Sequence, residues 1–204
     1  MTATYAVSSK LMTFAEFLEW KPNRRYELHN GVAVEMQPTG KHDEISGFLA
    51  IELALEIRRC NLNYFLGRDT LIKAPEGDTA YAPDGVVIDR TALAREPLWQ
   101  KSSTLIHGTS IPLVIEITSN NWRDDYWHKL SDYETLGIAE YWIVDYQALG
   151  GRRYIGEPKV PTISVFQLVN EEYQAQLFRG NDRIRSKVFP ELNLTAEQIF
   201  RAGA

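Results

Sequence analysis

The sequence predicts a mixed α/β (α+β) fold in which helices pack on a central mixed β-sheet. Three observations lead to this fold class: short β-rich runs fill the middle of the chain, helical patterns precede, interrupt and follow them, and Gly, Pro or Asp separates most of them. The 204 residues are 44% hydrophobic and 24% charged, as expected for one globular domain. We therefore expect residues 1–204 to form a single domain.

The N-terminal part of the chain predicts a short helix, a hairpin and a long helix. Thr13 and Glu16 have the spacing of a capping box, which marks the start of the short helix. Asn30-Gly31 separates two alternating arms within residues 25–36, the pattern of a β-hairpin. Apolar residues at helical spacing in residues 43–60 predict the long helix.

The rest of the chain predicts mostly strands, because β-branched and aromatic residues cluster in short runs. The expected strands are residues 63–73, 85–89, 103–107, 112–117 and 141–146. One helix, expected at 121–137, interrupts them and ends at Gly137. A C-terminal hairpin is expected at 162–168 and 173–179, and a closing helix at 195–201.

Composition excludes several classes of protein. No apolar run approaches the about 20 residues that a membrane span needs, so we expect no membrane association. The start of the chain has no apolar signal segment and Cys60 has no partner for an internal disulfide, so we expect a cytoplasmic protein. The net charge of −5 gives no general attraction to a polyanion. Binding to nucleic acid would therefore depend on a local site.

Two carboxylates interrupt apolar strands. Glu116 lies within 112–117, a run that is apolar on both faces and typical of a central strand. Asp84 follows Pro83 and leads into the strand at 85–89. A buried carboxylate needs a partner, and two neighbouring carboxylates often share a divalent cation. If the two strands are neighbours, Asp84 and Glu116 can lie together.

A lysine lies in the aromatic stripe of the helix at 121–137. At about 100° per residue, Trp122, Tyr126, Lys129 and Tyr133 fall within roughly 80° of one another. Lys129 should therefore point toward the sheet, where it could reach the carboxylates. A buried ammonium beside two carboxylates and a metal can hold or deprotonate a water for phosphodiester hydrolysis. Each of the three residues also has a purely structural interpretation. Glu116 could pair with an arginine in the core, Asp84 could belong to a turn, and Lys129 could extend to solvent.

Several segments of the chain resemble the Uma-two family of bacterial endonucleases. They are residues 25–31 (RYELHNG), 82–84 (APD), 113–119 (LVIEITS) and 137–145 (GIAEYWIVD), together with Asp125, Lys129 and Tyr133. This family has a restriction endonuclease-like, PD-(D/E)xK fold, and the resemblance extends from about Thr13 to Phe200. It implies that residues 1–204 form one restriction endonuclease-like domain.

The resemblance implies a role for each residue of the site. Asp84 is the motif aspartate and Glu116 the motif acid, both as metal ligands, and Lys129 replaces the usual motif lysine, because Thr118 stands where that lysine would be. Glu27 also matches a family position: it could lie near the metal or bind a partner, or be an exposed strand residue. His42 could contact phosphate or cap the long helix, and we favour capping.

We therefore expect a metal-dependent endonuclease that hydrolyses DNA. Asp84, Glu116 and the backbone carbonyl of Ile117 would bind Mg²⁺ or Mn²⁺, while Lys129 acts on the attacking water. The alternative is a catalytically silent module of the same fold that binds nucleic acid or protein. RNA as the substrate and a homodimer with two active sites both remain open. Candidate basic groups for nucleic acid are Arg24, Arg25, Lys41, Arg58, Arg59, Arg152, Arg153, Lys159 and the segment 179–187.

Overall fold

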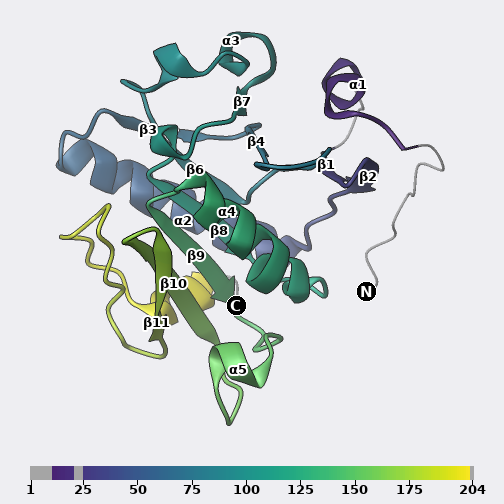
Figure 1. Ribbon diagram of the computed structural model, residues 1–204. Helices are drawn as coiled ribbons and strands as arrows, with labels where there is room; N and C mark the ends of the chain where they lie inside the picture. The colour runs from purple at the N-terminus through teal and green to yellow at the C-terminus, as the bar shows by residue number, and fades with distance from the viewer. Residues whose placement is uncertain (1–10, 21–24, 203–204) are drawn as a thin grey trace.

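The structure is a computed structural model and describes residues 11–20 and 25–202. In these residues the strands form two mixed sheets (Figure 1). The six-stranded sheet has the order β11 (Glu172–Phe178), β10 (Thr162–Val169), β9 (Glu140–Asp145), β8 (Leu113–Ile117), β6 (Gly85–Asp89) and β3 (Tyr64–Gly67). The five-stranded sheet has the order β2 (Val32–Glu35), β1 (Tyr26–His29), β5 (Ala80–Tyr81), β4 (Leu71–Lys73) and β7 (Thr104–Leu105). The mixed α/β class is confirmed.

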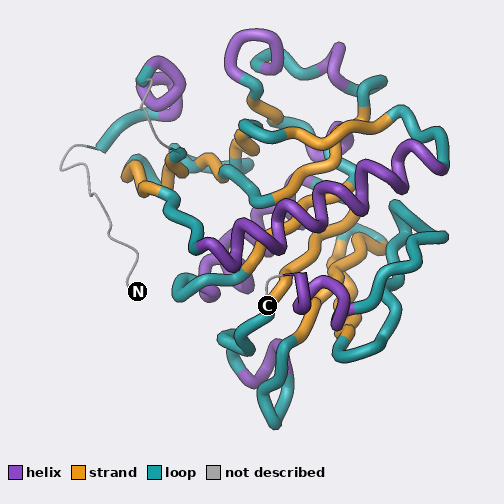
Figure 2. Tube along the Cα trace, turned by 180° about the vertical axis from the view of Figure 1, so that it is seen from behind, coloured by secondary structure: helices purple, strands orange, loops and turns teal. Residues whose placement is uncertain are grey.

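Helices lie on both faces of the six-stranded sheet. Figure 2 shows the long helix α2 (Gly40–Arg59) crossing one face, and Figure 1 shows the helix that contains α4 (Leu130–Leu136) on the other. The other helical segments are α1 (Phe14–Glu19), η1 (Leu93–Arg95), α3 (Trp99–Ser102), η2 (Gly108–Ser110), η3 (Asp124–Lys129), α5 (Arg152–Ile155) and α6 (Ala196–Ala202). No helix in the described parts of the chain is both long and apolar enough to cross a membrane.

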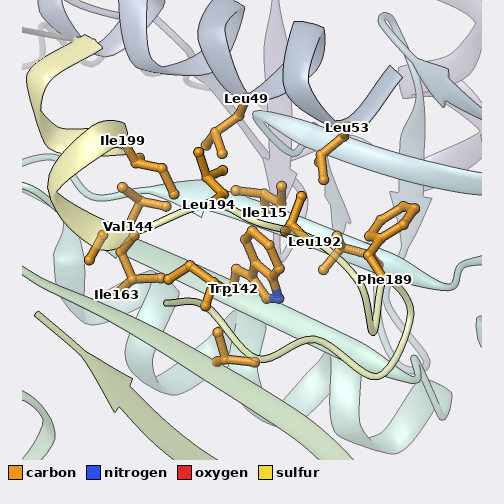
Figure 3. Packing of buried hydrophobic residues seen from close by; sticks show 14 of the residues in the cluster. Leu49, Leu53, Ile115, Trp142, Val144, Ile163, Phe189, Leu192, Leu194 and Ile199 are labelled. Carbon is orange, nitrogen blue, oxygen red and sulfur yellow. The ribbon is translucent and has the colours of Figure 1, made fainter. Parts of the chain in front are cut away.

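The alternation of strand β8 divides the core into two layers. Ile115 packs with Leu49 and Leu53 of α2 and with Trp142 of β9 (Figure 3). Val114, on the opposite face, packs with residues of η3 and α4. All five residues of β8 are buried, as expected for a strand that pairs with β6 on one side and β9 on the other. Because Glu116 alternates with Ile115, its side chain lies on the side of η3 and α4.

The N-terminal hairpin forms as predicted. Asn30 and Gly31 have φ angles of 48° and 82°, and the left-handed conformation of both residues closes the two-residue turn between β1 and β2. The Thr13–Glu16 capping box at the start of α1 is also confirmed. The hairpin is not an isolated extension, because β1 pairs with β5 and so belongs to the second sheet.

The strand expected at 63–73 is wrong as a single element. It is two strands, β3 and β4, that belong to different sheets. The chain folds back between them so closely that a Cβ on Gly67 would lie 2.2 Å from Oγ1 of Thr70. Glycine permits this approach, and a tertiary contact of this kind leaves no trace in the local hydrophobic pattern. The strand expected at 103–107 is shorter, because β7 has two residues.

The helix expected at 121–137 forms, but part of it is not an α-helix. Residues Asp124–Lys129 form the π-helix η3, which continues directly into α4 and ends at Gly137 in the left-handed conformation. Tyr126, Lys129 and Tyr133 are buried, so the inward direction predicted for this stripe is confirmed. Helix α2 begins at Gly40, three residues before the predicted start at Asp43.

Candidate active site

The centre of the site is one buried ammonium group with carboxylates around it. The side chain of Lys129 is 3% exposed, and its Nζ lies 3.0 Å from Oε1 of Glu27 and 3.1 Å from Oε2 of Glu116. Oδ1 of Asp125, one turn earlier in η3, is 3.6 Å away. Nζ also lies 5.5 Å from the centre of the Tyr81 ring. The three carboxylates are buried, so this is an ionic cluster removed from water.

Neighbouring groups fix two of these carboxylates in place. Tyr133, from α4, donates its hydroxyl hydrogen to Oε1 of Glu116 at 3.0 Å. Oε1 of Glu27 accepts the backbone N–H of Ala82 at 3.0 Å, and its Oε2 lies 2.8 Å from Nε2 of His29. The cluster therefore joins β8, the helix η3–α4, the first strand of the second sheet and the segment that leads to Asp84.

Burial and charge move the pKa values of the cluster in opposite directions. Burial opposes the charge on Lys129, but the surrounding carboxylates, Glu116 foremost, outweigh it and raise the pKa of Lys129 well above its usual value. Burial would also raise the pKa of Glu27, yet the charge of Lys129 and the hydrogen bond to His29 lower it to about 2. Lys129 and Glu27 are therefore an ion pair at neutral pH.

The other two carboxylates are harder to ionise. Burial raises the pKa of Glu116 well above its usual value, although the charge of Lys129 acts against this rise. Burial likewise raises the pKa of Asp125 to about 7, again against the effect of Lys129. One ammonium cannot neutralise three carboxylates, so the charge of Lys129 does not offset the effect of burial on the pKa values of Glu116 and Asp125.

Asp84 lies beside this cluster and contacts helix α2, which covers the other face of the six-stranded sheet. Its Oδ2 accepts the backbone N–H of Ile117 at 2.8 Å and lies 3.0 Å from Nε2 of His42 on α2. Nη1 of Arg25 is 3.9 Å from its Oδ1. Burial would raise the pKa of Asp84, but His42, the Ile117 N–H and Arg25 together lower it. The charge of Asp84 in turn raises the pKa of Glu116.

The approach to strand β6 is held by hydrogen bonds from three elements. The guanidinium of Arg25 donates to the carbonyl oxygens of Ala82, at 2.6 Å, and of Pro83. Ser46 of α2 donates to the carbonyl oxygen of Asp84 at 3.1 Å. Because these bonds fix the backbone around Asp84, its carboxylate is positioned before any ligand binds.

The structure brings the predicted residues together in two adjoining groups. Glu27, Glu116 and Lys129 are in direct contact, and so are Asp84, His42 and the backbone of Ile117. The two groups adjoin because Ile117 follows Glu116 in β8. Asp84 comes before β6 rather than within it, so strand alternation does not set its direction.

The structure excludes one of the two interpretations of Glu27 and the favoured interpretation of His42. Glu27 is not an exposed strand residue: it is 2% exposed and contacts Lys129 of the helix η3. The His42 side chain does not cap α2. Thr39 caps this helix and accepts the backbone N–H of His42, which leaves the imidazole free to contact Asp84.

Three residues of the site were not predicted as such. Asp125 entered the sequence analysis only as a position of family resemblance. Tyr133 entered it as such a position and as part of the aromatic stripe, and Arg25 as part of a resembling segment and as a candidate basic group. Asp125 could have been found as the acid one turn before Lys129 on the same helix. Arg24 lies outside the described residues. Arg59 pairs with Glu56 and Glu191, and Arg152 with Glu157, so these arginines are engaged elsewhere.

The oxygen atoms at the site are chemically suitable ligands for a hard divalent cation. Carboxylate and carbonyl oxygens are the ligands that Mg²⁺ prefers, and the buried cluster has more carboxylates than cations. Nδ1 of His42, beside Asp84, is buried and has no hydrogen-bond partner within residues 11–20 and 25–202. In those same residues no three His, Cys, Asp or Glu side chains form a ready metal cluster.

The fold, with helices on both faces of the six-stranded sheet, has a counterpart among solved structures. A crystal structure of "a putative nuclease belonging to DUF820 from Anabaena variabilis ATCC 29413" matches with a TM-score of 0.71 and 17% sequence identity. The match covers 95% of this chain and 99% of that one, so the two share their whole fold.

The family model of Uma2, described as "Putative restriction endonuclease", matches residues 14–197. The chain therefore belongs to the Uma2 family, which confirms the resemblance found in its sequence. No curated protein matches the chain. The family model supports a nuclease function in general terms, and the structural match supports the fold.

Proposed function

We propose that the chain is a metal-dependent endonuclease that hydrolyses phosphodiester bonds in DNA. The observation that supports this proposal most directly is the contact between Lys129 and Glu116, 3.1 Å apart and buried, beside the pre-positioned carboxylate of Asp84. An aspartate just before strand β6, a second acid in the adjoining strand β8 and a lysine on the helix that follows β8 are the groups that a nuclease of this fold requires. Their burial in an otherwise apolar core is costly, and function gives a reason for that cost.

Asp84 and Glu116, with the backbone carbonyl of Ile117, would hold Mg²⁺ or Mn²⁺ in this proposal. The ion would supply Lewis-acid stabilisation of the charge that develops on the phosphate. Asp84 suits this role because its lowered pKa keeps it ionised at neutral pH. Glu116 has a raised pKa, so a cation that binds it competes with a proton, and metal binding should strengthen as the pH rises.

Lys129 would orient the attacking water and offset negative charge on the phosphate. Of the two roles expected from the sequence, holding or deprotonating water, the raised pKa supports the first, because a lysine that stays protonated cannot accept a proton. Glu27 and Tyr133 are positioning residues in this scheme, since one fixes Lys129 and the other fixes Glu116. His42 is a positioning residue as well, because its Nε2 lies 3.0 Å from Oδ2 of Asp84.

DNA is the substrate that we propose, and RNA is the alternative that the experiment must test. The net charge of −5 means that attraction to the backbone would come from local groups such as Arg25 and Lys41. Two copies of the chain would allow paired cuts in a duplex, and light scattering at the working concentration would show whether a homodimer forms.

The test is cleavage of supercoiled, linear and single-stranded DNA and of RNA, each with Mg²⁺, Mn²⁺ or EDTA. Glu116→Gln and Asp84→Asn each replace a carboxyl group that can bind a cation with a neutral amide of the same shape. Asp124→Asn is the matched control, because Asp124 belongs to the same helix as Lys129 but pairs with His128 at the surface. We expect metal-dependent cleavage by the wild type and by Asp124→Asn, and none by the other two variants.

Equal cleavage by the wild type and Glu116→Gln would contradict the proposed site.

One observation favours the second candidate, a catalytically silent binding module. Both carboxylate oxygens of Glu116 already have partners, Lys129 and Tyr133. Absence of cleavage on every substrate, together with absence of calorimetric metal binding, would support that module instead.

A further inference from the structure

A pocket of about 250 Å³ opens next to Asp84, on the side of the sheet away from Lys129. Its walls come from helix α2, from the turn after strand β3 and from the first residues of β6. Asp84 belongs both to this pocket and to the candidate active site. A ligand in the pocket would therefore adjoin the reacting phosphate, if that phosphate binds as proposed above.

The deep part of the pocket is apolar. Leu49, Leu53, Leu66, Ile115 and Ile117 line it, and four of these residues, all except Leu66, are buried members of the main core. Such walls favour a flat, weakly hydrated group over a charged one, since burying a charge without a partner is costly.

The rim of the pocket has charges of both signs. Arg25 and Arg68 supply hydrogen-bond donors, while Asp43 and Asp69 supply acceptors. Asp43, Arg68 and Asp69 are exposed, so their side chains can adjust to a ligand. Groups of both kinds around an apolar slot would recognise a neutral ring whose edge has both an amino group and a carbonyl.

Helix α2 leaves room on this side of the pocket because its lining residues there are small. Gly47 and Ala50 line the pocket, and a Cβ built on Gly47 would meet no atom within 4 Å. Glycine in the middle of a helix is destabilising, and nothing in the packing requires it at this position. The open space beside Gly47 is thus not the result of a close contact between backbones.

We propose that this pocket binds one unstacked nucleobase of the substrate, next to the phosphodiester that lies at Asp84. This inference rests on the proposed nuclease function and specifies how its substrate is held. The volume is below the roughly 300–1,000 Å³ of pockets for larger ligands, so it limits the occupant to a single base. The base must leave the helical stack to enter, which favours single-stranded or distorted sites.

Guanine and cytosine fit the rim best. Each has an exocyclic amino group for a carboxylate such as Asp43 or Asp69, and a carbonyl for an arginine such as Arg25 or Arg68. Arginine can also stack on the face of a base that is splayed out of a strand.

The test compares Gly47→Leu, which fills the pocket, with Gly47→Ala, which changes helix propensity in the same direction and leaves most of the space open. The first measurement is NMR titration of the wild type, without metal, with deoxyguanosine monophosphate, deoxycytidine monophosphate and deoxyribose 5-phosphate. We expect the two nucleotides to shift the amides of Gly47 and Gly85, and the base-free sugar phosphate to leave them in place. Gly47→Leu should lose these shifts and Gly47→Ala should keep them.

The second measurement is cleavage of single-stranded DNA by the same two variants. Loss of the contacts of one base should lower the rate roughly tenfold in Gly47→Leu relative to Gly47→Ala. Nucleotide shifts that map outside the pocket, or that persist unchanged in Gly47→Leu, would overturn the inference even if the wild type is a nuclease. Nucleotide-induced shifts at the pocket, without cleavage by the wild type or by any variant, would contradict the proposed nuclease function and support the base-binding pocket.

Discussion

Lys129 and Glu27 are 102 positions apart in the chain, yet Nζ of one lies 3.0 Å from Oε1 of the other. Glu27 belongs to the five-stranded sheet, and Lys129 belongs to the helix that covers the six-stranded sheet. Both side chains are almost fully buried, so the attraction between them is little screened by water. This ion pair ties the N-terminal hairpin to the candidate active site.

We expect Lys129→Met to lower the free energy of unfolding by about 3–5 kcal/mol, since it leaves buried carboxylates without their cation. Glu27→Gln should also destabilise, and the double variant should lose less than the sum of the two single losses. Urea unfolding of all four proteins measures this coupling. A coupling energy below about 0.5 kcal/mol would mean that the two side chains act independently.

Tyr133→Phe removes the hydroxyl that donates to Glu116 and leaves the ring in the core. Removing one partner of a buried hydrogen bond costs about 1–3 kcal/mol, so we expect a loss in that range. Tyr141→Phe is the matched control, because its equally buried hydroxyl donates to a neutral carbonyl, that of Asp125, at 3.1 Å. Thermal unfolding that ranked the control as the more damaging change would contradict the role given to Tyr133.

The pair of His42 and Asp84 should make stability depend on pH. Burial would lower the pKa of His42, but the hydrogen bond and charge of Asp84 raise it above 6.5 in the folded protein. The contribution of the pair is then complete below 6.5 and is lost as the pH rises through the folded pKa. We expect His42→Gln to destabilise more at about pH 6 than at about pH 9, as measured by urea unfolding. The reverse order would show that His42 is neutral in the fold.

Gly108 should tolerate no side chain, because a Cβ there would lie 2.1 Å from the carbonyl oxygen of Leu136. The obstacle is backbone at the end of α4 and cannot rotate away. Gly108→Ala should therefore cost about 1–3 kcal/mol and displace the helix that holds Tyr133. Gly47→Ala is the contrasting case: with no atom within 4 Å, it should raise stability by about 1 kcal/mol. Calorimetry that found the two changes equal would rule out this packing argument.

Local chemistry accounts for the parts of the fold that were predicted correctly. The Asn30-Gly31 turn and the Thr13–Glu16 capping box depend on neighbouring residues alone, and both formed as expected. The division of residues 63–73 between two sheets depends on a contact at Gly67 that only the folded chain makes. Strand β5, with two residues, is too short to give a hydrophobic pattern of its own.

The same distinction applies to the site. Glu116 and Lys129 stood out because each is a charge within an apolar pattern, and the structure places them in contact. The local pattern around Glu27 did not mark it as buried, because a glutamate is also common on the solvent face of a strand. Only the folded chain shows that Glu27 is covered. His42 was assigned to capping because the first turn of a helix offers that role to any polar residue, and Thr39 fills it instead.

The π-helical turn at Asp124–Lys129 sets the orientation of Lys129 relative to the residues before it. Conversion of this turn to α-helix with the same number of residues would rotate Lys129 by about 100° relative to Trp122. Every residue of the site could then be present in the gene while the ammonium no longer faced Glu27 and Glu116. In this architecture, activity can disappear through a change in helical phase, and an inventory of motif residues would not reveal the loss.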